Sequence, residues 1–229
     1  YSPHRSEFFC TAGRNGVGET LILVHMPKLA ANLSLLFSEE DFLDRFDVAA
    51  TYGFKGVEFL FPYEHPAEAI RHALNENRLE QALFNMPPGN WLAGDRGTGA
   101  IPGRESEFLS SLELALDYAG ILNCSQIHVM AGIVEDEKAR REAHATFVEN
   151  LKRAAPLAAK RDVHLLIEPI NNKRDIPGYF LNYVTDARAI INEVQSEHVQ
   201  LQFDLYHVQI MSGDPIYTEM IIEYSRNPS

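Results

Sequence analysis

Cysteine is scarce in this sequence, with only Cys10 and Cys124 among 229 residues. Two cysteines do not make the disulfide framework on which small secreted domains depend, so a reducing compartment is predicted and we expect a cytoplasmic protein. Long hydrophobic runs are also missing. The longest one near the start, LILVHM at 21–26, is far too short to span a membrane and lacks the layout of a signal peptide. No membrane association is predicted.

Positive charge is in short supply as well. The chain has 20 lysines and arginines against 32 aspartates and glutamates, which gives a net charge of −12. A nucleic-acid-binding protein normally shows a basic surface, so that class of partner is disfavoured. We expect a small-molecule substrate instead, and a homo-oligomer stays open.

The remaining composition is that of a soluble globular protein, with 45% hydrophobic and 23% charged residues. A chain of this length forms one or two domains, and α/β barrels of this size often form one. Residues 1–25 show neither a helical nor a strand period, and Met26 opens a regular pattern. We therefore predict an atypical leader over 1–25 and one domain over 26–229; the alternative is that 1–25 form a genuine capping segment.

From Met26 onward, apolar runs alternate with segments of helical periodicity. The helix predicted over 38–53 has Ser38 as its N-cap and Gly53 just after its end. Thr185 is a possible N-cap for a later helix, and Pro156 should kink or shorten the helix over 136–160. The predicted strands are 28–33, 56–61, 79–85, 125–132, 162–169 and 199–204, and the predicted helices are 38–53, 66–78, 107–122, 136–160, 185–194 and 216–225.

Strict alternation of strands and helices indicates a parallel sheet covered by helices, as in a doubly wound sheet or a (β/α)8 barrel. A dinucleotide-binding doubly wound fold would show a glycine-rich turn after its first strand, and NLSLLF at 32–37 has no glycine. A barrel places its active site at the carboxyl ends of its strands. Polar residues stand at these ends, namely Asn32, Glu58, Asn85, His128, Glu168 and Asp204. The sequence therefore predicts a (β/α)8 barrel of which about six units are present.

Glu168 and Asp204 end two apolar strands, where an unpaired carboxylate is costly. Two such acids at one barrel mouth would repel each other, and a divalent cation removes that repulsion, because carboxylate oxygens are ligands that Mg²⁺ and Mn²⁺ prefer. His207 follows closely and could donate a hydrogen bond to a substrate oxygen. The alternatives are a strand-end acid paired with a lysine or backbone group for Glu168, and a helix cap for Asp204.

Further candidate substrate contacts are Glu58, Asn85 and His128 at strand ends, and Trp91 and Arg104 in a long loop over 85–105. Long loops in compact domains are often functional, and this glycine-rich one could close as a lid over an anionic substrate. Glu58 could instead be a structural acid, and His128 a buried core histidine. Trp91 could anchor the surface, and the loop could be a solvated Ω-loop.

Several stretches together are specific enough to indicate a family. AANLSLLF (30–37), GFKGVEFLFPY (53–63), FNMPPGNWLAGDRG (84–97), IPGRE (101–105), LLIEPIN (165–171), IPGYFL (176–181) and FDLYHVQIMSGD (203–214) resemble the hydroxypyruvate isomerases among the xylose-isomerase-like TIM barrels. The resemblance implies that hydroxypyruvate and 2-hydroxy-3-oxopropanoate are interconverted through an enediolate with the help of a divalent metal. It assigns metal ligation to Glu168 and Asp204, acid/base work to Glu168 and a substrate contact to His207.

The same resemblance leaves part of the site unassigned. Two further metal ligands, one of them the second acid/base glutamate, are expected on strands seven and eight. No sequence motif that matches these strands follows MSGD at 211–214. We therefore expect a chain that is truncated before those strands and whose own activity is uncertain. The alternatives are a 2-oxo-tetronate isomerase or related sugar epimerase, a phosphodiesterase of the AP-endonuclease type, and an inactive barrel fragment that pairs its open edges with another chain.

Overall fold

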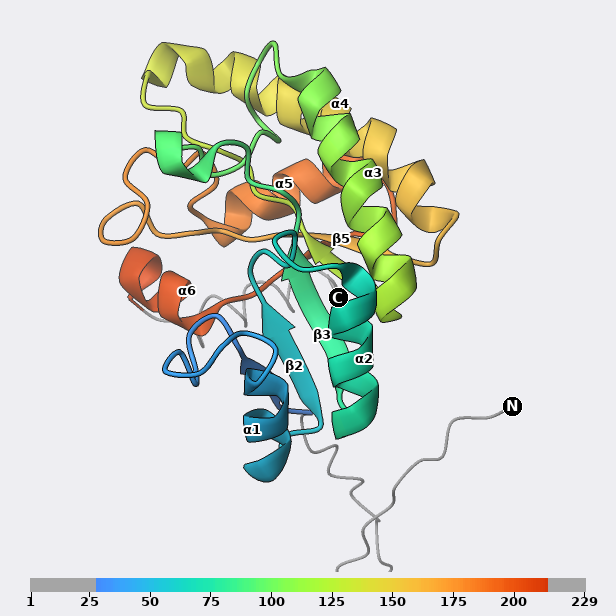
Figure 1. Ribbon diagram of the computed structural model, residues 1–229. Coiled ribbons are helices and arrows are strands. Elements are labelled where there is room, and N and C mark those ends of the chain that lie inside the picture. The colour runs from blue at the N-terminus through green and yellow to red at the C-terminus, as the bar shows by residue number, and fades with distance from the viewer. Residues whose placement is uncertain (1–27, 214–229) are drawn as a thin grey trace, which may run out of the picture.

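The computed structural model describes residues 28–213, which form a parallel sheet with its helices in one layer (Figure 1). The helix predicted over 216–225 and the leader predicted over 1–25 lie outside these residues. The strands are β1 (Ala30–Asn32), β2 (Gly56–Phe59), β3 (Glu80–Asn85), β4 (Gln126–His128), β5 (His164–Ile167) and β6 (Val199–Leu201). The α-helices are α1 (Arg45–Thr51), α2 (Ala67–Asn77), α3 (Glu105–Leu122), α4 (Arg140–Ala159), α5 (Val184–Val194) and α6 (Leu205–Ser212). Two short 3-10 helices, η1 (Trp91–Ala93) and η2 (Glu137–Ala139), complete the set.

The strand order in the sheet is the order in the chain, β1-β2-β3-β4-β5-β6, and every pairing is parallel. A doubly wound sheet reverses its strand order at a switch point. Each helix from α1 to α4 also packs against the helix that follows it in the chain, so α1 to α5 form one continuous layer. All of the strands are therefore covered from the same side. The predicted TIM-barrel type of fold, with six β/α units, is confirmed.

The core lies between this helical layer and the strands. Phe46, Phe84, Phe108 and Phe147 are fully buried, one each from α1, β3, α3 and α4. Tyr179 is fully buried too, and its hydroxyl accepts a hydrogen bond of 2.9 Å from the backbone N–H of Ala131. These contacts fix the loops that follow β4 and β5 against each other.

The first helix begins later than predicted. It starts at Arg45 with Asp44 at the N-cap, and residues 38–44 form turns instead, so the prediction of Ser38 as N-cap is wrong. The side chain of Arg45 explains this, because its guanidinium donates hydrogen bonds to the carbonyls of Leu33 (2.8 Å) and Glu40 (2.9 Å). The predicted end is confirmed, since Gly53 follows the helix with a φ of 90°.

Two other expectations about helix ends also fail. The helix α4 continues past Pro156 to Ala159 and so does not end early. Proline removes only one helical hydrogen bond, and the neighbouring Ala154, Ala155 and Ala158 are buried against the core, which stabilises the last turn. Thr185 does not cap α5, because that helix begins at Val184 after an N-cap at Tyr183.

Candidate metal and substrate site

Glu168 follows directly after β5 and is 6% exposed. Its Oε2 lies 3.6 Å from Nδ1 of His128, and Gln202 donates a hydrogen bond to the carboxylate. Burial, followed by the negative charges of Asp204 and Glu58, raises the pKa of Glu168 to about 8, and the hydrogen bond from Gln202 opposes this rise. The position is therefore an expensive one for a carboxylate that has no cation beside it.

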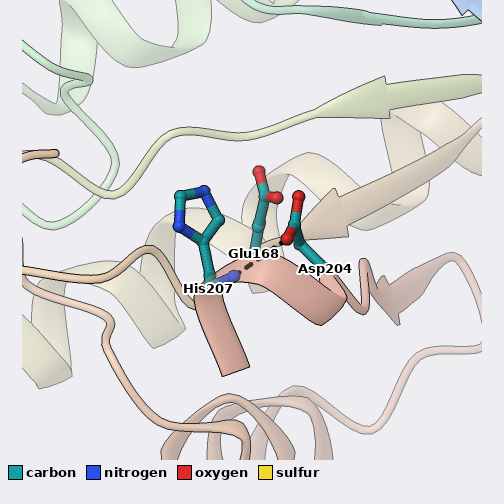
Figure 2. A group of neighbouring side chains, drawn as sticks. All are labelled: Glu168, Asp204 and His207. Carbon is teal, nitrogen blue, oxygen red and sulfur yellow. Dashed lines mark hydrogen bonds between the residues drawn. The ribbon is translucent and has the colours of Figure 1, made fainter. Parts of the chain in front are cut away.

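Asp204 is the N-cap residue of α6, and its Oδ1 accepts a hydrogen bond of 2.9 Å from the backbone N–H of His207. The cap that was the alternative interpretation of Asp204 is therefore present, although no helix was predicted over 205–212. Because the chain turns from β6 straight into α6, the imidazole of His207 is brought next to the two carboxylates. Figure 2 shows Glu168, Asp204 and His207 pointing to the same side of the α6 N-terminus.

One ligand atom from each of these three residues lies within 4.8 Å of the others, so the group could hold a metal ion. The charges of the site also favour a bound cation, because the carboxylate of Asp204 repels that of Glu168, which is buried. A bound cation would reverse this unfavourable interaction. The two carboxylates offer the oxygen ligands that suit Mg²⁺ or Mn²⁺. The residues present therefore fit a divalent metal.

Glu58 belongs to the same electrostatic group. Its Oε1 accepts a hydrogen bond of 2.9 Å from Nδ2 of Asn32, which lies opposite it in the register of β1 and β2. Burial raises the pKa of Glu58, the Asn32 amide lowers it, and the charge of Asp204 raises it again. The pairing of β1 with β2 therefore holds a third carboxylate, that of Glu58, near Asp204 at the end of β6.

His128 and Asn85 lie opposite each other at the ends of β4 and β3, and both are almost fully buried. Burial, together with the smaller effect of the nearby His207, lowers the pKa of His128 to about 3, so His128 is neutral. Its Nε2 has no hydrogen-bond partner among residues 28–213. A buried polar atom without a partner beside Glu168 is suited to a substrate hydroxyl.

The long loop over 85–105 is anchored to the rest of the fold, although its tip at Trp91 and Leu92 is exposed. Gly97 pairs with Ala131 in an isolated bridge. The ring of Trp91 contacts Phe61, at 5.2 Å between ring centroids, and the guanidinium of Arg96, at 3.7 Å from the ring centroid. The guanidinium of Arg104 donates to Asp95 (2.8 Å) and Glu107 (2.7 Å). The structure therefore places Arg104 in a local ion-pair cluster.

Sequence reasoning missed two polar residues that contact this site, Gln202 and Asn171. Gln202 donates to Glu168 but its Oε1 has no partner among the described residues, while Asn171 is fully buried against His207. The only signal for either was a polar residue in an otherwise apolar stretch, in VQLQFD (199–204) and EPINN (168–172).

The model of the family described as xylose isomerase-like TIM barrel matches residues 46–226. This chain belongs to that family. The chain is 52% identical over 189 residues to the 2-oxo-tetronate isomerase of Cupriavidus necator, which covers 82% of this chain and 72% of that protein. It is 45% identical over 189 residues to the hydroxypyruvate isomerase of Escherichia coli, which covers 82% of this chain and 73% of that protein.

Solved structures support the same placement within the family. A crystal structure named AP endonuclease, family 2, from Brucella melitensis superposes with a TM-score of 0.82 at 46% identity, over 87% of this chain and 76% of that one. The 3-keto-D-glucoside 4-epimerase of E. coli superposes with a TM-score of 0.70 at 20% identity, over 85% of this chain and 74% of that one, which shows the shared fold.

The chain is thus a member of the sugar and hydroxy-acid isomerases of the hydroxypyruvate isomerase and 2-oxo-tetronate isomerase family. The names of its relatives describe enzymes that act on small molecules. None of the helices within residues 28–213 is both long and apolar enough to cross a bilayer.

Proposed function

We propose that this chain takes part in the isomerisation of a short hydroxy-oxo acid, in which a carbonyl group moves between neighbouring carbons. The first candidate reaction interconverts hydroxypyruvate and 2-hydroxy-3-oxopropanoate. The observation that carries the proposal is the convergence of Glu168, Asp204 and His207 at the ends of β5 and β6, in a chain 45% identical to a hydroxypyruvate isomerase.

Glu168 and Asp204 would hold a Mg²⁺ or Mn²⁺ ion. When bound, the cation polarises the carbonyl and hydroxyl oxygens of the substrate and stabilises the negative charge that develops on them. Glu168 would accept the proton from carbon 3 of hydroxypyruvate, and its burial next to the other site residues supports this role. Return of a proton to carbon 2, and transfer of the hydroxyl proton from the oxygen on carbon 3 to the oxygen on carbon 2, complete the isomerisation.

The other candidate residues would bind and orient the substrate. His207 is placed to donate a hydrogen bond to a substrate oxygen, and the unpartnered Nε2 of His128 is available to a hydroxyl group. Glu58 and Asn85 line the ends of neighbouring strands. Arg104 would have to exchange one of its two carboxylate partners for the substrate carboxylate, and Trp91 would cover the site from the same loop.

A second substrate, 2-oxo-tetronate, is favoured by the identity of 52% to a 2-oxo-tetronate isomerase. This acid is one carbon longer than hydroxypyruvate, and its carbonyl can move by the same transfer of a proton between neighbouring carbons. A phosphodiesterase of the AP-endonuclease type is disfavoured, because the net charge of −12 would repel a phosphate backbone.

The test separates proton removal from complete turnover. The full chain is incubated in D2O with Mn²⁺ and either acid, and ¹H NMR follows the exchange of the proton on carbon 3 as well as the appearance of isomer. A chimera that adds the C-terminal segment of the E. coli hydroxypyruvate isomerase is measured beside it.

We expect the chimera to turn over one of the two acids, and Glu168→Gln to slow exchange by about 10²–10⁴-fold. Asp117→Asn is a suitable control, because Asp117 pairs with Arg161 and plays no part in the proposed site. The proposal fails if neither protein exchanges the proton of either acid, or if Glu168→Gln exchanges it as fast as the unmodified chain.

A further inference from the structure

Asn171 lies in the loop after β5 and is fully buried. Its Oδ1 accepts hydrogen bonds from the backbone N–H groups of Arg174 (3.0 Å) and Asp175 (3.3 Å). An amide nitrogen cannot accept such bonds, so these two contacts determine which end of the side chain is oxygen. The other end of the Asn171 side chain is therefore the NH2 group.

That NH2 group faces two atoms. Nδ2 of Asn171 lies 2.7 Å from Oδ2 of Asp175 and 2.8 Å from Nδ1 of His207, and the backbone N–H of Asn171 also points at Nδ1, at 3.4 Å. An amide NH2 group has two hydrogens to give and accepts nothing, so both of its neighbours must be acceptors. Nδ1 of His207 therefore carries a lone pair, and in a neutral imidazole the single hydrogen is then on Nε2.

We propose that Asn171 is a positioning residue that holds neutral His207 in the tautomer with its hydrogen on Nε2. In this tautomer neither ring nitrogen has a free lone pair, since that of Nδ1 receives the hydrogen bonds of Asn171. His207 then offers an N–H group to a substrate oxygen, and Glu168 and Asp204 are the metal ligands among the three clustered residues. The substrate and the metal rest on the proposed function, whereas the tautomer does not.

The competing arrangement would have Nδ1 of His207 donate to Asp175, whose Oδ2 lies 3.5 Å away. That distance is longer than the 2.8 Å to the Asn171 amide, and it would set two hydrogens against each other. Asp175 is also occupied, because its Oδ2 accepts from Asn171 and its Oδ1 accepts from the hydroxyl of Tyr206 at 3.1 Å. Asp175 therefore orients Asn171, which in turn orients His207.

The tautomer can be read directly by ¹⁵N NMR of the imidazole ring. The full chain is labelled with ¹⁵N-histidine and measured at a pH of about 8.5, where an imidazole is neutral. Its nine histidines require an assignment, and the signals lost in His207→Gln provide it. We expect Nδ1 of His207 to be unprotonated and Nε2 protonated. The reverse pattern in the unmodified chain overturns the proposal, whatever any variant does.

Asn171→Asp tests whether Asn171 causes the tautomer. The variant keeps an oxygen for the backbone N–H groups of Arg174 and Asp175 but replaces the donor with an acceptor, so we expect the hydrogen of His207 to move to Nδ1. Asn172→Asp is the matched control: it adds the same charge at the next residue, whose Nδ2 donates to Asn182 and not to His207. An unchanged ring pattern in Asn171→Asp would contradict the proposed role.

Binding of Mn²⁺, followed by electron paramagnetic resonance, tests the consequence for the metal. We expect Asp204→Asn to weaken Mn²⁺ binding about tenfold or more, and His207→Gln to change it less than about threefold. Equal losses in the two variants would make His207 a ligand and overturn the proposal. If the unmodified chain binds no Mn²⁺, the proposed function fails, while the NMR pattern still decides the tautomer.

Discussion

Asn32 donates a hydrogen bond of 2.9 Å from Nδ2 to Oε1 of Glu58, across the pairing of β1 and β2. Glu58 in turn lies in the electrostatic field of Asp204, which follows β6. The carboxyl ends of the two outermost strands among residues 28–213 are thereby connected to one charged site. Polar side chains, and not only strand pairing, therefore relate the first strand to the last.

Removal of this hydrogen bond should destabilise the fold. Asn32→Ala leaves a half-buried carboxylate without its amide donor, so we expect a loss of about 1–2 kcal/mol in the free energy of unfolding, measured by urea denaturation. In the Glu58→Gln background the same substitution should cost clearly less. Equal costs in the two backgrounds would show that the two side chains are not coupled.

Metal binding should raise the thermal stability of the chain, because a cation between Glu168 and Asp204 relieves their repulsion. We expect Mn²⁺ at a hundred times its dissociation constant to stabilise the folded chain by about 2.7 kcal/mol, seen as a rise in Tm. Asp204→Asn should abolish most of this rise, whereas Asp117→Asn, at a surface ion pair, should keep it. A rise of the same size in Asp204→Asn would place the bound ion elsewhere.

The ion-pair cluster in the long loop should make stability depend on pH. The hydrogen bond from Arg104 holds the pKa of Asp95 below its usual range, and an unfolded aspartate titrates near about 3.9. The contribution of the pair is therefore complete above that pH and is lost as the pH falls through the lower pKa of the folded state.

Arg104→Gln should consequently lower the free energy of unfolding by about 1 kcal/mol at pH 7, and by progressively less as the pH falls below the pKa of an unfolded aspartate. Lys152→Gln, which removes a more exposed pair with Glu149, is the control and should have a smaller effect at pH 7. A loss in Arg104→Gln that is independent of pH would mean that the side chain acts by packing alone.

Two glycines of the same loop allow a strained backbone to be distinguished from a close contact. Gly97 and Gly94 both have positive φ angles, of 113° and 102°. A Cβ at Gly97 would clash with the carbonyl oxygen of Met130, whereas a Cβ at Gly94 would meet no atom within 4 Å. We expect Gly94→Ala to cost about 1–2 kcal/mol for the φ angle alone and Gly97→Ala to cost more. Similar losses in urea denaturation would show that the contact with Met130 relaxes freely.

The sequence predicted the order of strands and helices because apolar periodicity is local and repeats in every unit. It also predicted that Glu168, Asp204 and His207 belong together, since acids at strand ends of a barrel share one face. It failed at the start of α1, where the side chain of Arg45 donates hydrogen bonds to carbonyls in the loop that precedes the helix. Such a contact between a side chain and a folded loop has no signature in the periodicity.

Asn171 was missed for a related reason. Its neighbour His207 is separated from it by 36 residues, so only the folded chain shows that the amide faces the imidazole. Gln202 was read as part of an apolar strand, although the chain has left β6 at this position and its amide reaches Glu168. Candidate substrate contacts can be predicted from their residue types, whereas the residues that orient them can be identified only from distances in the folded chain.

Asp204 and His207 are held together within a single turn, by the hydrogen bond that starts α6. Glu168 reaches them from the next strand, so the distance between the two halves of the site depends on the pairing of β5 with β6, in which Ile167 lies opposite Leu201. A slip of one residue in that pairing would move the halves apart by about 3.3 Å and turn the side chains to the other face. The width of the site is thus set by one pair of short strands.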